Sequence, residues 1–302
     1  MKSRHCMILV GLCLGILCRG QTVIEIQAQT EDREYLLGET IRLAITVKND
    51  SGNALRFNEW DDGRVYCRIE GPDDRLVGGD EDHMQTRRVE KDGREVEQTR
   101  MNLGQGLVLP PGAQQRNVVI INQLYQMSKP GHYRIQACLN HRRLTQEFRS
   151  KPFLISIKGG QEVLTKNIGL PADDDGPIVT RQCALVDFHY RRMQMYCLRI
   201  SDERFIYAVR RLTKHIKGDR PQLIADARSQ IHILIQTEPK LFTYWIYDLE
   251  GKLKQIVNYR VVKESIPFLH RDPDIGRVMV VGGRQVVPGS NDDEALPDYH
   301  PE

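Results

Sequence analysis

The sequence lacks the compact motifs by which catalytic and cofactor sites are commonly found. It has no Gly-x-Ser-x-Gly elbow, no His-Glu-x-x-His zinc motif, no phosphate loop and no dinucleotide fingerprint. It also has no Cys-x-x-Cys pair, so neither a zinc ribbon nor a thioredoxin-like site is indicated. We therefore predict no cofactor and no metal site, and we favour a protein without catalytic activity. Carboxylates brought together from separate loops leave no local signature, so the question of catalysis stays open.

Long hydrophobic runs are also missing. After residue 20 no segment approaches the ~18 uncharged apolar residues that a membrane-spanning helix needs, so we expect no transmembrane segment in the mature chain. The first 20 residues follow the order of a signal peptide, with Lys2 and Arg4, an uncharged apolar run over 8–17, and small residues near 18–20. An uncleaved anchor is the alternative. We expect a cleaved signal peptide over 1–20 and a secreted or periplasmic protein. A lipid anchor is not expected, because a leucine precedes each cysteine that could accept one.

The mature chain has no excess of charge of either sign. Loss of Lys2, Arg4 and Arg19 with the signal peptide takes the 43 basic residues to 40, equal to the 40 acidic residues. Nucleic-acid binders usually carry a concentrated basic surface, and no such concentration is present. We therefore expect another protein or a component of the cell envelope as the partner, and no nucleic acid.

Alternating apolar and polar residues run through the first half of the mature chain. This period of two is typical of strands with one buried face. At least six such strands, separated by turn residues, predict a two-sheet antiparallel sandwich. The best examples of the apolar positions are Ile41, Leu43, Ile45 and Val47; Val65, Cys67 and Ile69; Tyr133, Ile135 and Ala137; and Phe153, Ile155 and Ile157.

Three short stretches of this region resemble bacterial immunoglobulin-like modules. They are Leu-Gly-Glu-Thr-Ile-Arg-Leu at 37–43, Leu-Pro-Pro-Gly at 109–112 and Pro-Gly-His-Tyr-Arg-Ile at 130–135. The resemblance covers roughly residues 22–158. It departs from antibody-type domains, because Trp60 precedes Cys67 instead of following it. Similar modules include stalks, adhesion domains and an inhibitor-like group, so the resemblance implies a fold more than a function.

The chain divides by composition into five parts. Two prolines, a glycine and three aspartates at 171–177 predict a linker between domains. The region after it is again rich in strands, and a strand, acidic turn and strand at 196–212 recur at 244–259, which indicates a duplicated hairpin. We thus expect an all-β protein with a signal peptide at 1–20, an immunoglobulin-like β-sandwich at 21–160, a linker at 161–180, a second β-rich domain at 181–287 and a disordered acidic tail at 288–302.

Four cysteines remain after residue 20. A hairpin turn centred on Tyr190 would place Cys183 opposite Cys197, so we predict a cross-strand disulfide there. Cys67 and Cys138 have the sequence separation of a bridge between sheets, but Cys138 is out of phase with the apolar positions of its strand. A β-bulge would be needed to pair them, which makes this the weaker disulfide prediction. The alternative in both cases is a pair of free thiols.

Two groups of residues are candidate contact sites. The polar stretch over 77–104 is either a mobile loop or a binding loop, with Asp80, Glu81, Asp82 and His83 as the candidate binding residues. Adjacent carboxylates point in different directions, so we predict no calcium site there. Trp60 and Trp245 are candidate aromatic contacts, with packing in the core or between domains as the alternative.

The function predicted from these features is that of an exported, non-enzymatic interaction or scaffold protein. One alternative is a hydrolase of envelope or extracellular material, which needs two carboxylates within ~5–10 Å of each other in a cleft. A second alternative is an inhibitor-like module, which needs a rigid and exposed loop.

Overall fold

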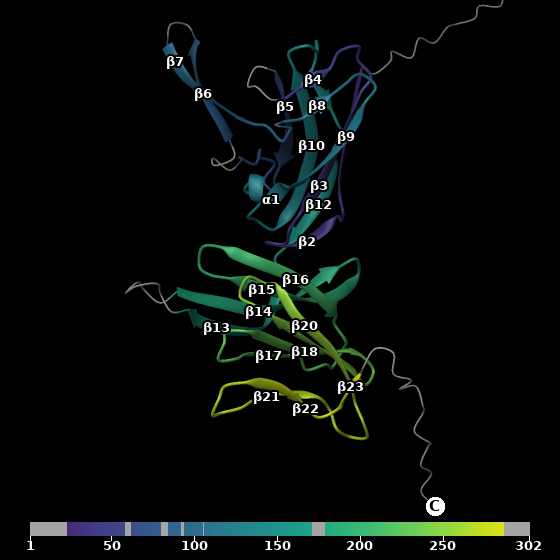
Figure 1. The fold of residues 1–302 in the computed structure, drawn as a ribbon, viewed down its shortest axis with the longest axis vertical. Coiled ribbons are helices and arrows are strands. Elements are labelled where there is room, and N and C mark those ends of the chain that lie inside the picture. The colour runs from purple at the N-terminus through teal and green to yellow at the C-terminus, as the bar shows by residue number, and fades with distance from the viewer. Residues whose placement is uncertain are drawn as a thin grey trace, which may run out of the picture.

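The chain is built almost wholly from strands, which confirms the predicted all-β class (Figure 1). A computed structural model describes residues 23–57, 62–79, 84–91, 94–104, 106–170 and 179–286. One helix occurs in these residues, the single turn α1 (Ile121–Leu124). The predicted signal peptide at 1–20 and acidic tail at 288–302 lie outside the described residues.

The first domain is a sandwich of two sheets. One sheet has the order β1 (Ile24–Thr30), β3 (Arg42–Asn49) and β9 (Gln114–Ile120), all antiparallel. In the other sheet, β10 (Gly131–His141) pairs with β5 (Gly63–Glu70) along one edge and with β11 (Phe148–Arg149) and β12 (Phe153–Lys158) along the other. The short β2 (Glu34–Leu36) extends this sheet by pairing in parallel with β12.

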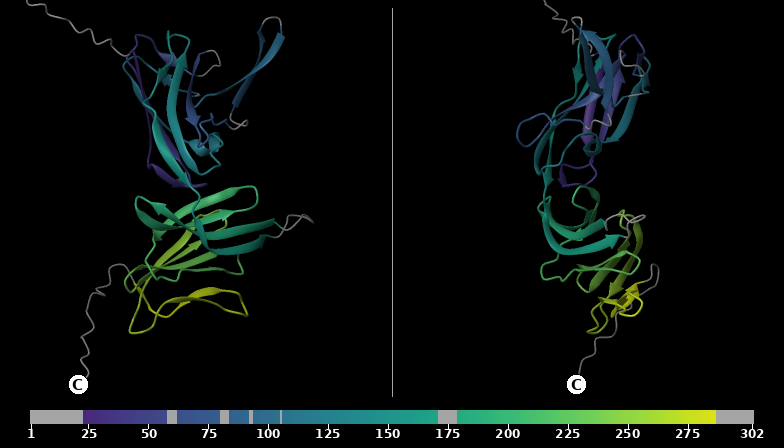
Figure 2. Two further views of the ribbon diagram at one scale, coloured as in Figure 1. Left: turned by 180° about the vertical axis from the view of Figure 1, so that it is seen from behind. Right: turned by 90° about the vertical axis from the view of Figure 1, so that its left-hand side faces the viewer.

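The core of the first domain lies between these two sheets. Its residues include most of the apolar alternation read from the sequence, and the buried positions are Leu43, Ile45, Val47, Val65, Cys67, Ile69, Tyr133, Ile135, Ala137, Ile155 and Ile157. Two minor pairs complete the domain. They are β4 (Leu55–Arg56) with β8 (Val108–Leu109), and β6 (Met84–Lys91) with β7 (Arg94–Met101). The β6–β7 hairpin stands away from the sandwich (Figure 2, left).

The second domain is also a sandwich, made of two meanders. The first meander joins β13 (Gln161–Leu170), β14 (Val179–Tyr190), β15 (Met193–Ser201) and β16 (Ile206–Lys214). The second joins β17 (Gln222–Ala225), β18 (Ile231–Glu238), β19 (Leu241–Tyr247) and β20 (Leu253–Arg260), with β23 (Arg284–Val286) beside β20. The β15–β16 and β19–β20 hairpins correspond to the recurring hairpin read from the sequence. The core between the meanders includes Leu198, Ile200, Ile233 and Trp245.

The segment predicted as a linker, 161–180, is not one. Its first ten residues form β13, which pairs with β14 along nearly its whole length up to Leu170 and Val179. The Pro- and Asp-rich stretch at 171–178 therefore connects the two strands of a hairpin within the second domain. Composition alone does not distinguish a segment between two paired strands of one domain from a boundary between domains. The first domain ends at β12, and only Gly159 and Gly160 separate it from β13.

The layers follow one another along the long axis of the molecule. The first domain covers the outer face of the β13–β16 sheet, and the β21 (Phe268–Arg271) and β22 (Val278–Val281) hairpin covers the outer face of the β17–β20 sheet (Figures 1 and 2). Leu36 of β2 packs among Val186, Phe188 and Val209 on the first of these faces. The second domain thus buries apolar residues on both of its outer faces as well as in its own core.

Arg211 of β16 makes the main polar contacts between the domains. Its Nη1 lies 3.0 Å from Asp32 Oδ2, and its Nε lies 2.6 Å from Glu39 Oε1. Its Nη2 donates to the backbone oxygen of Glu34 at 2.9 Å, and the guanidinium lies 4.2 Å from the ring centroid of Tyr190. Burial disfavours the charge of Arg211, but the hydrogen bonds and charges of its partners outweigh that effect and raise its pKa. The carboxylates of Asp32 and Glu39, both in the first domain, balance the positive charge of Arg211.

Candidate functional site

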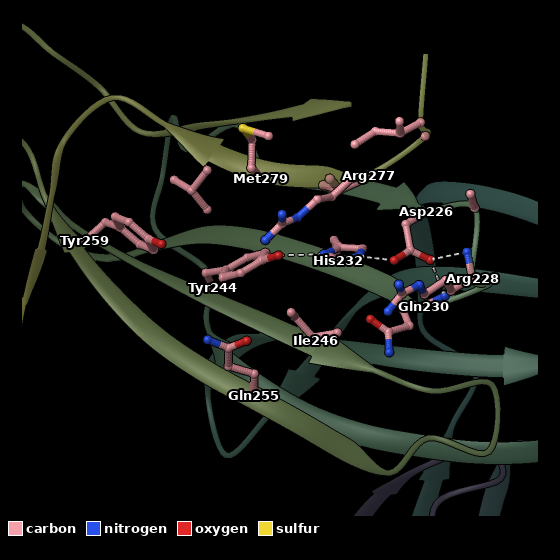
Figure 3. Close-up of a pocket in the computed structure, with 15 residues that line it drawn as sticks. Asp226, Arg228, Gln230, His232, Tyr244, Ile246, Gln255, Tyr259, Arg277 and Met279 are labelled. Carbon is pink, nitrogen blue, oxygen red and sulfur yellow. Dashed lines mark hydrogen bonds and ion pairs between the residues drawn. The ribbon is translucent and has the colours of Figure 1, made fainter. Parts of the chain in front are cut away.

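A cleft of about 750 Å³ opens between the outer face of the β17–β20 sheet and the β21–β22 hairpin. Its size lies within the range typical of ligand sites, about 300–1,000 Å³. Strands β18, β19 and β20 supply its floor, the loop after β17 closes one end, and the hairpin forms the facing wall (Figure 3). The residues used below are Asp226, Arg228, His232, Tyr244, Tyr259 and Arg277.

A chain of three polar side chains lies at the base of the cleft (Figure 3). The Nε2 atom of His232 lies 3.2 Å from Asp226 Oδ2, and its Nδ1 is 2.5 Å from the hydroxyl oxygen of Tyr244. The carboxylate beside Nε2 favours the tautomer with its proton on that nitrogen, which leaves Nδ1 to accept the hydroxyl proton of Tyr244. Asp226 itself is fixed by the backbone N–H groups of Arg228 and Gln230, which both donate to Oδ1 at 2.8 Å.

The pKa values of His232 and Tyr244 determine which of the two side chains holds the proton between them. Burial lowers the pKa of His232, with Asp226 acting in the opposite direction. Burial raises the pKa of Tyr244 to about 12, and the neighbouring Tyr259 and Asp226 act in the same direction. The proton between the two rings therefore stays on Tyr244 at neutral pH, and His232 stays uncharged. The network orients the side chains and has little tendency to transfer a proton.

Arg277 brings positive charge to the open side of the cleft. It precedes β22 and reaches towards Tyr244 and Tyr259 (Figure 3). A tight loop holds its backbone, because Arg277 O accepts from Asp272 N–H at 2.8 Å. The neighbouring Gly276 has φ +65°, and a Cβ there would lie 2.9 Å from the Cβ of Ala227, so the two loops meet too closely for a side chain. Among the described residues, the guanidinium of Arg277 has no carboxylate partner.

The predicted disulfide between Cys183 and Cys197 is wrong, and both thiols are free. Cys183 lies opposite Ile200 in the register, and Cys197 lies opposite Val186. The turn is a two-residue one at Arg191 and Arg192, both with positive φ, instead of being centred on Tyr190. This odd shift of register turns the two thiols to opposite faces of the sheet, Cys183 into the sandwich core and Cys197 towards the first domain.

Cys67 and Cys138 are also free thiols. They lie on adjacent strands of one sheet, where Cys67 pairs with Ala137 and Cys138 pairs with Tyr66. The two side chains therefore point to opposite faces, as the phase of the sequence indicated. Burial raises the pKa of all four cysteines, to about 12 for Cys183. They are packing residues with little thiolate character.

Trp245 is buried in the core of the second domain, with 6 % of its surface exposed, so core packing explains it and contact with a ligand does not. Trp60 and the candidate binding residues Asp80, Glu81, Asp82 and His83 lie outside the described residues. Part of the stretch predicted as a polar loop, 77–104, forms the β6–β7 hairpin instead.

The residues of the cleft were not singled out by the sequence. The alternation around His232 does predict that its side chain faces away from Ile231 and Ile233, and it does so. His232 is only 3 % exposed, because the β21–β22 hairpin covers that face. The signal that could have found the site is polar residues at 232, 244 and 259 on one sheet face, with Asp226 in the loop that precedes β18.

Comparison with known proteins gives no family. No family model matches the chain, and no curated protein matches it. The crystal structure of Spo0M, a sporulation control protein from Bacillus subtilis, is similar over 79 % of this chain and 90 % of that chain, with 11 % identity and a TM-score of 0.27. A likeness at that TM-score carries no argument about this chain.

Two further properties concern the described part of the chain. No helix in it has the length and hydrophobicity needed to cross a membrane. No group of three or more His, Cys, Asp or Glu side chains in it is arranged to hold a metal ion.

Proposed function

We propose that the chain is an exported, non-enzymatic binding protein whose second domain receives an anionic group of its partner in the cleft. The observation that carries this proposal is the positive charge of Arg277, which has no carboxylate partner in the described part of the chain and lies beside the hydroxyl group of Tyr259. The guanidinium of Arg277 and the hydroxyl of Tyr259 supply donors of the kind that carboxylate and phosphate groups accept, whereas the hydroxyl proton of Tyr244 is donated to His232. The one acid that lines the cleft in the described residues, Asp226, is already engaged by loop amides and by His232.

Binding is favoured over catalysis by the composition of the cleft. Its described lining contains no Ser, Thr, Cys or Lys that could act as a nucleophile. It contains a single carboxylate, whereas the hydrolase alternative needs two. The proton between His232 and Tyr244 is held on the group with the higher pKa, so this pair is a poor general base.

Export and the nature of the first domain belong to the same proposal. The order of charge and apolar residues at 1–20 supports a cleaved signal peptide and a secreted or periplasmic location. The motifs at 37–43, 109–112 and 130–135 support an immunoglobulin-like module as the first domain. An inhibitor-like module is the second candidate for this domain. Fractionation of the cells tests export, and recovery of the protein in the cytoplasm alone would contradict it. Sequencing of the N-terminus of the exported protein tests cleavage, and a start at residue 1 would contradict that.

The anion site is tested with citrate and inorganic phosphate as probes and glucose as the neutral control, by isothermal titration calorimetry. We expect saturable binding of at least one anion and none of glucose. Arg277→Gln should weaken that binding at least about tenfold, because a hydrogen bond to a charged group contributes about 1.5–3 kcal/mol. Arg204→Gln is the matched control, since Arg204 is an exposed arginine in the β15–β16 turn, outside the cleft. Binding of neither anion, or equal losses in both variants, would refute the site.

A further inference from the structure

Strand β1 is an edge strand whose outward backbone groups can be identified. Asn49 of β3 donates its N–H to Ala113 O at 2.9 Å and accepts from Gly112 N–H at 2.6 Å, so both of its backbone groups point away from β1. Its register partner is Ile24. In an antiparallel pair such residues turn their backbone groups away from each other, and the pattern repeats every second residue. The N–H and C=O groups of Ile24, Ile26 and Ala28 therefore point to the open edge of the sheet.

A groove of about 490 Å³ runs beside this edge. Its lining includes the six consecutive residues Ile24–Gln29. Successive side chains of a strand point to opposite faces, so a groove that touches six in a row follows the edge of the backbone. It also extends over the outer face of the sheet, where Ala44 and Thr46 of β3 line it. Arg149 and Lys151 line the groove from the other sheet of the sandwich. The groove thus offers an unpaired backbone on one side and basic side chains on the other.

The edge of β1 is less protected by its own sequence than the edges at β13, β20 and β9, and β11 of the other sheet lies near it. Natural proteins guard open edges with lysine, proline, bulges or covering segments. Strand β13 has a bulge between Glu162 and Leu164, and β23 covers part of β20. Strand β9 carries Arg116. Strand β1 pairs with β3 in unbroken register over seven residues, and its one charged residue, Glu25, lies opposite Lys48.

We infer that the β1 edge accepts an extended acidic segment of a partner polypeptide as an additional strand. Main-chain hydrogen bonds to the outward groups of Ile24, Ile26 and Ala28 would supply affinity, as in other cases of strand addition. Lys151 has no carboxylate partner among the described residues, and Glu147 occupies Arg149. Acidic side chains of the added strand would therefore lie beside Lys151. This surface is in the first domain and does not depend on the cleft of the second.

The test uses a fluorescein-labelled nine-residue peptide of alternating valine and glutamate, with fluorescence anisotropy as the readout. The variant is Ala28→Pro, which removes an outward N–H and leaves the bonds between β1 and β3 in place. Val118→Pro is the matched control. Its register partner Ala44 has its backbone groups towards β1, so the N–H of Val118 points to the other open edge of the sheet. We expect Ala28→Pro to weaken binding at least tenfold and Val118→Pro to change it less than twofold, with both variants folded by circular dichroism.

Two further peptides test which features of the partner are recognised. The same peptide with N-methyl groups on alternate amides should lose binding at least tenfold, and a valine–lysine peptide should bind at least tenfold more weakly than the valine–glutamate one. Should Ala28→Pro fail to fold, Lys151→Glu replaces it, with reversal of the preference for the acidic peptide expected. Equal binding of both peptides, or of the N-methylated one, would overturn the inference. Dimerisation of the wild type that Ala28→Pro abolishes in sedimentation would overturn it too, because a second copy would then be the added strand.

Discussion

Each outer face of the second domain carries an arginine, and the two arginines differ in whether carboxylates lie beside them. On the β13–β16 face, Arg211 is enclosed by the first domain and paired with Asp32 and Glu39. On the β17–β20 face, Arg277 lies at the mouth of a cleft and has no carboxylate partner among the described residues. A matched arginine holds two parts of a protein together, and an unmatched one remains available to a ligand. The same sandwich therefore uses one face for docking of its own chain, and the other is the face at which we propose that a ligand binds.

The two outer faces also differ in how their tight turns are stabilised. The hairpin turn at Arg191 and Arg192 adopts positive φ at two non-glycine residues, which is unfavourable without compensation. The first domain provides the compensation, since Glu34 accepts from the N–H of Arg191 at 2.8 Å and Asp32 lies 3.0 Å from its guanidinium. At the cleft, the close approach of two loops is met by Gly276 instead.

The largest effect is expected from Arg211→Met. The substitution keeps the apolar stem but leaves Asp32 and Glu39 without their cation in a mostly buried interface. Loss of one partner of a buried ion pair costs about 3–5 kcal/mol, and the 25 % exposure of the Arg211 side chain places our expectation near the lower value, about 3 kcal/mol. Urea unfolding at pH 7 measures it. Arg277→Met is the matched control and should change the free energy of unfolding by less than about 0.5 kcal/mol.

Equal costs for Arg211→Met and Arg277→Met would contradict the distinction between the two faces. Limited proteolysis adds a second measure. Faster cleavage near Gly159 and Gly160 in Arg211→Met alone would show that the interface between the domains, and not the core of either, has been weakened.

A smaller effect is expected from acid. Burial raises the pKa of Asp32, but hydrogen bonds from Tyr190, from the Arg33 backbone, from Arg211 and from Arg191 outweigh it and lower the pKa to about 2. A carboxylate with a lowered pKa stabilises the folded state above its unfolded pKa, near 3.8, and this stabilisation is lost as the pH falls towards 2. We expect about 2 kcal/mol to be lost over this window. Asp32→Asn should be less stable at pH 7 and should lose less between pH 4 and pH 2. Parallel pH profiles for the two proteins would contradict the assignment.

The sequence predicts the faces of strands well because burial of one face imposes a period of two. The apolar positions read from the sequence in β3, β5 and β10 are buried, and those of β12 are buried except for the partly buried Phe153. Register is less well predicted. The assumed turn at Tyr190 gave the wrong pairing of β14 with β15, because the actual turn depends on contacts from a distant domain.

The cleft was not predicted for a related reason. Its floor comes from β18, β19 and β20, but its wall comes from the β21–β22 hairpin and its charge from Arg277. No local pattern around 268–281 indicates where that hairpin packs. Residues such as Asp226 and His232 gain their roles only when the loop after β17 and the hairpin meet, and that contact is tertiary.

The smallest effect concerns the hydrogen bond at the base of the cleft. Tyr244→Phe removes the hydroxyl that donates to His232 Nδ1 and leaves a buried nitrogen without its donor, at an expected cost of about 1 kcal/mol. Tyr259→Phe is the matched control in the same cleft, because no hydrogen bond of its hydroxyl occurs among the described residues. It should change the free energy of unfolding by no more than a few tenths of a kcal/mol. Urea unfolding at pH 7 measures both. A larger cost for Tyr259→Phe than for Tyr244→Phe would mean that the hydrogen bond between Tyr244 and His232 does not stabilise this face. The two outer faces would then differ only in the charge environment of Arg211 and Arg277.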